Sequence, residues 1–224
     1  MIKPFLLAAA ALAAMPAVAF AHPHIFADAR VEVVAEAGQI KELRNVCRFD
    51  EVFSSSVVMD FDKNGNSTLD PDELDEVGKT VKKSLGDYNY YANLFDNNRP
   101  VKVNPPDAIR VAYQDGQLLM FFAVTPKEAM PLKGNLSIGI YDPTLYTAID
   151  FATDDAMVTE GDDFKACKRA VVRPDPDEVI KQNQANLTQA FFNDPTGTNM
   201  SKLFATRLEV TCSCGARAFS SPPP

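Results

Sequence analysis

The sequence predicts an α+β fold that is mainly β: an antiparallel Ig-like sandwich with an inserted helix–loop–helix and a C-terminal helix. Short runs of alternating apolar and polar residues follow one another after residue 100, separated by turn signals, as in antiparallel sandwiches. A first alternating pair lies near the N-terminus, and helical spacing marks the stretch between them. We therefore expect one β-rich domain at 22–219, with a helical insertion at 49–96 and a disordered tail at 220–224.

The chain opens with the pattern of a secretory signal peptide. Lys3 gives the positive start, residues 5–15 are apolar, and Ala19 and Ala21 form a small-x-small cleavage site. Residues 1–21 would be removed on export, and no later segment is long and apolar enough to span a bilayer. We expect an exported protein, most simply a periplasmic one.

The first strands form a predicted hairpin. In residues 24–35, apolar side chains occupy alternate positions, with Ile25 and Val33 on the same face. Gly38 turns the chain back into residues 39–47. Further strands are expected at residues 101–103, 108–113, 117–124, 136–141, 146–151, 164–172 and 204–212, with Gln-Asp-Gly joining the second and third of these.

Two helices are expected in the insertion. Phe53, Val57 and Phe61 fall on one stripe of the helix at 51–61, and apolar residues recur at three- and four-residue spacing between Leu74 and Leu85. The stripes predict that each helix packs one side against the rest of the domain.

Two further helices are predicted. Residues 87–95 are aromatic and are expected to continue the insertion as a short helix. Near the C-terminus, Asp175-Pro-Asp-Glu178 is typical of a helix start, with an acceptor at the N-cap and proline in the first turn. This C-terminal helix should end before Pro195.

The stretch between the two inserted helices is typical of an EF-hand calcium loop. Such a loop needs oxygen ligands at positions 1, 3, 5, 9 and 12, and a backbone carbonyl at position 7. Ser67 stands at position 6, where glycine is usual, and a non-glycine residue with positive φ costs roughly 1–3 kcal/mol. We therefore expect weak calcium binding. The predicted ligands are Asp62, Asn64, Asn66, Thr68, Asp70 and Glu73.

The composition is acidic. The chain has 30 Asp and Glu against 22 Lys and Arg, a formal net charge of −8, and loss of Lys3 on export makes it one unit more negative. Without a basic patch, this charge argues against nucleic acid and anionic membrane surfaces as partners. It suits a protein that meets cations.

Both histidines of the chain, His22 and His24, lie at the predicted mature N-terminus. His22 would offer an α-amine and an imidazole to one metal, and His24 a third nitrogen. These groups titrate near ~7.7–8.0 and ~6.5, so they are readily deprotonated for binding. Pro23 has no N–H, which blocks the four-nitrogen mode through deprotonated amides. We expect a site for Zn, Ni, Co or Cu, completed by other groups such as Asp28 or the acidic loops.

The same histidine count argues against an enzyme. Without another histidine, the chain lacks the residues for a Ser-His-Asp triad, a Cys–His pair or a His-x-x-His zinc protease site. The carboxylate pairs Asp154-Asp155 and Asp162-Asp163 lie in loop-like stretches and are interpreted as solvated turns. One enzymatic alternative stays open, a copper oxygenase that uses an N-terminal histidine clamp.

Four cysteines in an exported chain indicate disulfides. They are Cys47, Cys167, Cys212 and Cys214, which allow three pairings. Cys47–Cys167 is the preferred bridge because each residue lies in a strand-like segment, whereas Cys212 and Cys214 are too close for a relaxed bridge. A soft-metal or redox site at the Cys-x-Cys sequence is the rival interpretation.

Several of these stretches together resemble a known bacterial family. They are His-Pro-His at 22–24, the first hairpin, Phe49-Asp-Glu-Val-Phe53, Asp60-Phe-Asp-Lys-Asn-Gly65 and Leu69-Asp-Pro-Asp-Glu-Leu74. In this combination the chain is similar to the domain-of-unknown-function family number one thousand and seven. Its members are usually described as periplasmic components of an uncharacterised ABC-type transport system, associated with nickel, cobalt or zinc permeases. The resemblance implies an accessory role in handling divalent transition metals.

The leading hypothesis is a periplasmic metal-binding accessory protein. His22 and His24 would capture Zn²⁺, Ni²⁺, Co²⁺ or Cu²⁺ and present it to the membrane permease of a metal transport system, while calcium in the loop at 62–73 stiffens the fold. The alternative is a calcium-dependent structural or interaction module in which the histidines have no role. EF-hand loops usually work in pairs, so a single loop of this kind favours a structural role or pairing in a dimer over a sensor.

Overall fold

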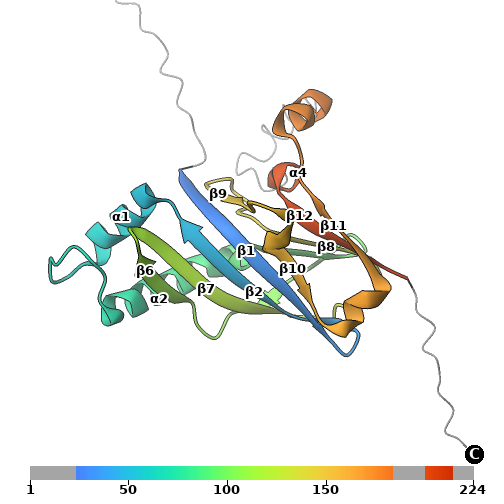
Figure 1. Cartoon of the computed structure of the whole chain (residues 1–224), viewed down its shortest axis with the longest axis horizontal. Helices are drawn as coiled ribbons and strands as arrows, with labels where there is room; N and C mark the ends of the chain where they lie inside the picture. The colour runs from blue at the N-terminus through green and yellow to red at the C-terminus, as the bar shows by residue number, and fades with distance from the viewer. Residues whose placement is uncertain (1–23, 184–199, 214–224) are drawn as a thin grey trace, which may run out of the picture.

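The computed structural model describes residues 24–183 and 200–213. The protein is mainly β with a few helices, as predicted, and the strands of the described residues form a seven-stranded sheet A and a five-stranded sheet B (Figure 1). Sheet A contains β1 (Ile25–Glu36), β2 (Gln39–Phe49), β5 (Val103–Asn104), β6 (Arg110–Gln114), β7 (Gln117–Pro126), β9 (Thr147–Asp150) and β10 (Met157–Glu160). Sheet B contains β3 (Ala92–Asp96), β4 (Arg99–Val101), β8 (Gly134–Ile140), β11 (Cys167–Val172) and β12 (Arg207–Cys212).

The predicted hairpins of sheet A are present. β1 and β2 pair antiparallel, and Ala37 and Gly38 turn the chain with φ of 55° and 76°. Asp115 and Gly116 turn it between β6 and β7 with φ of 53° and 78°. Positive φ at both central residues gives a tight turn whose twist matches that of the flanking strands. β7 also pairs with β2, so the two hairpins join into one sheet.

Sheet A is mixed, so the prediction of a purely antiparallel sandwich is wrong. β9 and β10 both run parallel to β1, with Ile25 aligned to Thr147 and Val31 to Met157. Both strands follow β8, which belongs to sheet B. The chain therefore crosses from sheet B back to sheet A before β9 and β10 pair with β1. Alternation in the sequence predicts a strand, whereas the crossing connection sets its direction.

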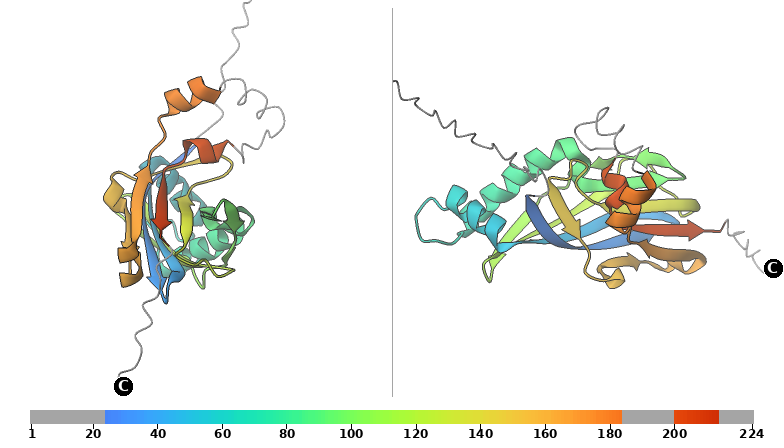
Figure 2. Two further views of the ribbon diagram at one scale, coloured as in Figure 1. Left: turned by 90° about the vertical axis from the view of Figure 1, so that its right-hand side faces the viewer. Right: turned by 90° about the horizontal axis from the view of Figure 1, so that it is seen from above.

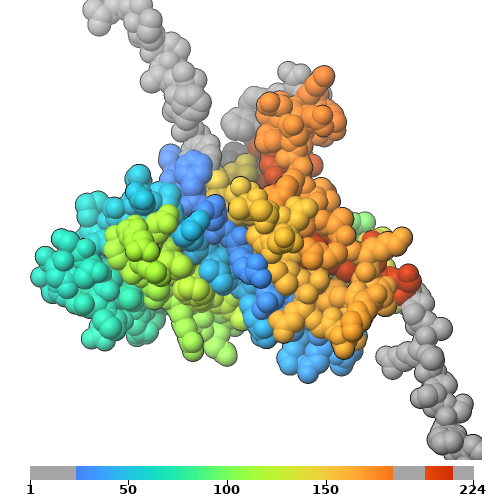
Figure 3. Space-filling model, viewed as in Figure 1, coloured from blue at the N-terminus to red at the C-terminus, as the bar shows by residue number. Residues whose placement is uncertain are grey.

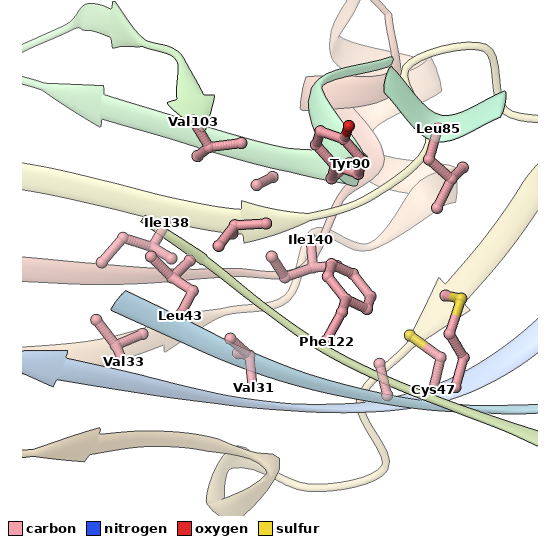
Figure 4. Close-up of a cluster of buried hydrophobic side chains, with 14 of the residues drawn as sticks. Val31, Val33, Leu43, Cys47, Leu85, Tyr90, Val103, Phe122, Ile138 and Ile140 are labelled. Carbon is pink, nitrogen blue, oxygen red and sulfur yellow. The ribbon is translucent and has the colours of Figure 1, made fainter. Parts of the chain in front are cut away.

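The two sheets bury one continuous apolar core between them. In Figures 1 and 2, β8, β11 and β12 lie toward one end of the molecule and the two inserted helices lie at the other. Figure 4 shows side chains from both sheets in this cluster. Each fully buried Val, Leu or Ile stabilises the fold by roughly 1.5–3 kcal/mol. Those with no exposed surface include Val31, Val33, Leu43, Leu136, Ile138, Leu208 and Val210.

The preferred disulfide, Cys47–Cys167, is wrong. Cys167 on β11 stands directly opposite Cys212 on β12, and these two residues are bonded. Cys47 lies in β2, buried and free. Both segments are strands, as predicted, but they belong to different sheets, and pairing follows the register within a sheet. A disulfide fits an exported protein. The rival Cys-x-Cys site includes Cys214, which lies outside the described residues.

The two predicted inserted helices are α1 (Glu51–Phe61) and α2 (Pro71–Leu85). α1 packs on β7 and α2 packs on β6. The helices thereby cover an end of the inner face of sheet A that sheet B leaves open. Val57 and Val77 are buried at this contact, in agreement with the predicted apolar stripes.

The predicted helix at 87–95 is wrong. A 3-10 segment, η1 (Gly86–Tyr91), ends in Asn89, Tyr90 and Tyr91, whose φ values of 52°, 53° and 58° cannot continue a helix. The chain then enters β3, where Ala92 and Leu94 are buried on one face at a spacing of two. Burial on alternate residues fits a strand that pairs with β8 and β4.

The predicted C-terminal helix begins at residue 176, and its described part extends to residue 183. Asp175 is its N-cap, since Oδ1 accepts from the N–H of Asp177 at 2.9 Å and of Glu178 at 3.3 Å. The predicted end before Pro195 lies outside the described residues. A short helix, α4 (Ser201–Phe204), precedes β12, which confirms the strand predicted near the end. None of the described helices combines the length and apolar character needed to cross a membrane.

Candidate metal-binding loop and His24

The loop at 62–73 joins α1 to α2 and forms one tip of the molecule, coloured teal in Figure 3. α1 ends at Phe61, and the N–H of Asp62 donates to the carbonyl of Val58 at 2.8 Å. α2 begins at Pro71 after the N-cap Asp70, which suits proline because the first helical position needs no N–H. Loop positions 1 and 9, both predicted calcium ligands, therefore lie at the two helix ends.

The Asp62 carboxylate accepts hydrogen bonds from several backbone N–H groups of the loop. Oδ2 accepts from Ser67 at 2.8 Å, and Oδ1 accepts from Gly65 at 2.7 Å and from Asn66 at 3.2 Å. These bonds, first of all the one from Ser67, hold the pKa of Asp62 below its usual value. Asp62 is thus ionised at neutral pH and can act as an anionic oxygen ligand.

Three further predicted ligands converge beside Asp62. Nδ2 of Asn64 donates to Oδ2 of Asp70 at 2.7 Å, and Nδ2 of Asn66 donates to the same oxygen at 3.2 Å. Oδ1 of Asn64 accepts from the N–H of Asn66, and Oδ1 of Asn66 accepts from the N–H of Thr68, each at 3.0 Å. The side chains at loop positions 3, 5 and 9 therefore point to one place.

Glu73, at loop position 12, lies beneath the loop with only 5% of its surface exposed. Oε1 accepts from the N–H of Lys63 at 2.8 Å, and Oε2 accepts from the N–H of Asp70 at 2.9 Å. Glu73 thereby ties the start of the loop to the start of α2. Leu69 is buried and anchors the loop to the core from the apolar side.

Ser67 adopts the left-handed conformation that loop position 6 requires, with φ of 64°. Glycine adopts this conformation without strain, whereas serine does so at a cost. The cost is offset in part by the hydrogen bond from its N–H to Asp62.

The chemistry of this donor set fits calcium, a hard cation that takes carboxylate and amide oxygens. Asp62, Asn64, Asn66 and Asp70 place such oxygens in one loop, and Glu73 adds a carboxylate beneath it. Within residues 24–183 and 200–213, however, no three His, Cys, Asp or Glu side chains gather into a group that could hold a metal. Amides stand between the carboxylates, so few charges face an ion, which indicates weak binding.

His24 is the first described residue, and His22 lies outside the described residues. The N–H of His24 donates to the carbonyl of Tyr146 at 2.9 Å, and the two rings lie 5.0 Å apart. These contacts place the start of β1 against the start of β9. Asp28, a suggested additional ligand, accepts a hydrogen bond from Arg48 at 2.6 Å.

A buried carboxylate at the start of β9 was not among the predicted site residues. Asp142 is 3% exposed. Its Oδ1 accepts from the N–H and hydroxyl of Thr144, and its Oδ2 accepts from the N–H of Thr147 and the hydroxyl of Tyr91. Burial raises the pKa of Tyr91 to about 12, so its hydroxyl keeps its proton. The only sequence signal is the Asp-Pro-Thr run, which indicates a turn.

The comparisons with known proteins agree with the resemblance read from the sequence. A family model described as a protein of unknown function (DUF1007) matches residues 7–212. An uncharacterized protein of Haemophilus influenzae is 28% identical over 200 residues, which cover 86% of this chain and 91% of that protein. An uncharacterized 15.5 kDa protein in the trpE 3′ region of Spirochaeta aurantia is 30% identical over 95 residues, 42% of this chain and 68% of that protein. Neither of these two names assigns a function.

Proposed function

The chain belongs to the DUF1007 family of proteins of unknown function, and we propose that it is an exported accessory protein that binds divalent metal ions. One observation supports this most directly. The side chains of Asp62, Asn64, Asn66 and Asp70 converge in the loop between α1 and α2, with Glu73 beneath them. Oxygen donors of this kind at this spacing suit calcium. The proposed role of calcium is structural, to hold α1 and α2 in a fixed relation.

The second half of the proposal concerns transition metals. After removal of residues 1–21 in the periplasm, His22 and His24 would supply an α-amine and two imidazoles to Zn²⁺, Ni²⁺, Co²⁺ or Cu²⁺. The backbone bond from His24 to Tyr146 supports this arrangement, because it would hold the second imidazole at a fixed place on the protein surface. The ion would then pass to the membrane permease of a metal transport system. The acidic charge of the chain suits a protein that attracts cations.

The two halves can be tested separately by isothermal titration of the processed chain, which starts at His22. A calcium Kd of roughly 10⁻⁴–10⁻³ M is expected, and the double variant Asp62→Asn, Glu73→Gln should abolish it. Asp72→Asn is the matched control, since Asp72 is exposed in the first turn of α2 and is not a predicted ligand. Unchanged calcium binding in the double variant would refute the loop as the site.

Transition-metal binding should depend on the histidines and on the free α-amine. The variant His22→Ala, His24→Ala, and a preparation with one extra residue before His22, should each bind Zn²⁺, Ni²⁺, Co²⁺ or Cu²⁺ far more weakly while calcium binding persists. If both preparations bind these ions as tightly as the processed chain, the N-terminal site does not exist.

A calcium-dependent interaction module is the second candidate, and the outer face of α1 favours it. Val52 and Met59, two turns apart on the same side of the helix, are 82% and 79% exposed. A partner could cover these side chains. Capture of one partner in calcium but not in chelator, unaffected by His22→Ala and His24→Ala, would select this function over metal transfer.

A further inference from the structure

A cavity of about 360 Å³ lies between α1, α2 and the end of sheet A that sheet B leaves uncovered. Its floor is the inner face of the sheet, where Leu118 and Met120 of β7 are almost completely buried. Val57 of α1 and Val77 of α2 form its walls. The volume falls in the range of about 300–1,000 Å³ that is usual for small-molecule sites. The metal-binding proposal makes no use of this cavity.

Aromatic side chains from four separate parts of the chain surround this space. Phe53 and Phe61 come from α1, Phe49 from the end of β2, Tyr91 from the end of η1, and Tyr146 from the residue before β9. The rings of Phe49 and Phe53 lie 5.1 Å apart and are tilted by 47°. Aromatic rings present a negative face that attracts organic cations, ammonium groups above all.

Among the described residues that line the cavity, Asp60 is the single charged one, and it is acidic. Asp60 is exposed in the last turn of α1, and its carboxylate makes no hydrogen bond or ion pair with another side chain or backbone group among the described residues. No lysine or arginine lines the cavity within the described part of the chain. The remaining polar groups at the mouth are hydroxyls, including those of Thr80 and Ser84 on α2. An anionic ligand would therefore meet a carboxylate with no compensating cation, whereas a cationic ligand would find a partner.

We propose that this cavity binds a small apolar organic cation, with its hydrocarbon part among the aromatic side chains and its ammonium group beside the Asp60 carboxylate. Burial of the hydrocarbon supplies most of the affinity, because apolar surface leaves water. The ion pair with the exposed carboxylate makes the cavity selective for cations, and it raises their affinity roughly two- to fivefold. This site needs neither calcium nor the N-terminal histidines.

The test uses three probes that differ only in their end group: 4-phenylbutyl-trimethylammonium, 4-phenylbutanol and 4-phenylbutanesulfonate. Each is titrated into the processed chain in the presence of a metal chelator, so that failure of the metal proposal does not affect the result. Binding is followed by calorimetry and by amide chemical shifts of α1, α2 and β7. We expect the cation to bind most tightly, the alcohol less tightly and the sulfonate least.

Two variants separate the roles of space and charge. Thr80→Phe should fill the mouth and weaken all three probes by at least tenfold, whereas Lys83→Phe, an exposed position on α2 that does not line the cavity, should leave them unchanged. Asp60→Asn should weaken only the cation, by roughly two- to fivefold, and remove the preference for positive charge. Asp72→Asn is the matched control, because it removes a carboxylate from α2 outside the cavity.

Several outcomes would overturn the proposal. They are the absence of shifts in α1, α2 and β7 with every probe, equal binding of the cation and the sulfonate by the unaltered chain, and binding that Thr80→Phe does not reduce. A basic amphipathic peptide that displaces the cation and binds far more tightly would also overturn it, since the occupant would then be a segment of a partner protein.

Discussion

The two ends of this molecule are stabilised in different ways. Where sheet B covers sheet A, Leu136, Ile138 and Leu208 have no exposed surface, and the Cys167–Cys212 disulfide closes the outer pair of strands. At the other end, α1 leaves Val52 and Met59 about four-fifths exposed and borders an open cavity. Close packing stabilises one end, whereas at the other end backbone N–H groups also donate hydrogen bonds to carboxylate side chains.

This difference matters for function. A close-packed core has few alternative arrangements and holds its geometry, so sheet B serves as a fixed support for the strands it covers. At the helix end, backbone N–H groups of the loop donate hydrogen bonds to the Asp62 carboxylate, so the order of the loop depends on that group remaining ionised. Regions of lower local stability are those from which binding loops are usually drawn. The proposed calcium loop and cation cavity both lie there.

The largest expected effect is the loss of the disulfide at the sheet B end. A closed loop with a sequence separation of 45 gives a contribution of about 4 kcal/mol in the chain-entropy model. The double variant Cys167→Ala, Cys212→Ala should lose about that much free energy of unfolding in urea titration. Reduction by dithiothreitol should destabilise the unaltered chain to the same level and leave the variant unchanged. A loss below about 1 kcal/mol would mean that packing alone secures this end.

A pair of truncations compares the ends directly. Ile138→Ala should lower the free energy of unfolding by about 2–5 kcal/mol, because it leaves a cavity at a fully buried position. Met59→Ala should change the free energy of unfolding by less than about 0.5 kcal/mol, because Met59 is exposed. Both changes in free energy are measured by chemical denaturation, with one common dependence of the free energy on denaturant concentration. Equal costs would show that the outer face of α1 is covered in solution, for example by a second copy of the chain.

The elements that sequence reasoning predicted well are those with local causes. Ala37-Gly38 and Asp115-Gly116 are turns because of their own backbone preferences, and the alternation beside them marks the strands. The loop at 62–73 is recognisable because its donors recur at fixed positions within twelve residues. Ser67 was expected to need positive φ, and it has it.

The errors concern relations between distant parts of the chain. Cys47 and Cys167 both lie in strands, but only the assembly of the sheets determines which residue faces which. β9 could not be predicted to run parallel to β1, since its direction depends on a crossing between sheets. In residues 87–95, an aromatic run suggested a helix, whereas burial against β8 selected a strand. The cavity combines two helices and several strands, so no single stretch of sequence could reveal it.

Ser67→Gly should raise the free energy of unfolding of the helix end by about 1 kcal/mol. Glycine removes a strain of roughly 1–3 kcal/mol at φ of 64°, and part of this gain is offset by its greater freedom when unfolded, roughly 0.5–1 kcal/mol. The N–H that donates to Asp62 is retained. Thermal unfolding in chelator measures the effect, and calcium titration should show tighter binding than in the unaltered chain.

Gly65→Ala is the matched opposite of that change. Gly65 has φ of 73°, and a Cβ added there would meet nothing within 4 Å. The variant therefore adds backbone strain alone, and it should lower stability by roughly 1–2 kcal/mol. If both variants left stability unchanged, the loop would already be unfolded in chelator, and the calcium ion would then have to order it.

Acid should loosen the helix end before the sheet end. Burial alone would raise the pKa of Asp50, but hydrogen bonds from the backbone N–H groups of Phe53 and Phe26 hold it below its usual value. The pKa of Asp62 is lowered by the loop N–H groups. Because both folded pKa values lie below the unfolded value of about 3.9, their stabilisation is complete above that pH and is lost as pH falls through the folded values.

Amide hydrogen exchange at about pH 6 and about pH 3, corrected for intrinsic rates, would measure this difference. Opening free energies in α1 and α2 should fall at the lower pH, whereas those in β8 and β12 should change less. Asp50→Asn should remove part of the pH response of α1, because an amide at the N-cap does not titrate. A uniform fall across both ends would mean that the molecule opens as one cooperative unit, so that the contrast in packing does not produce separate stabilities.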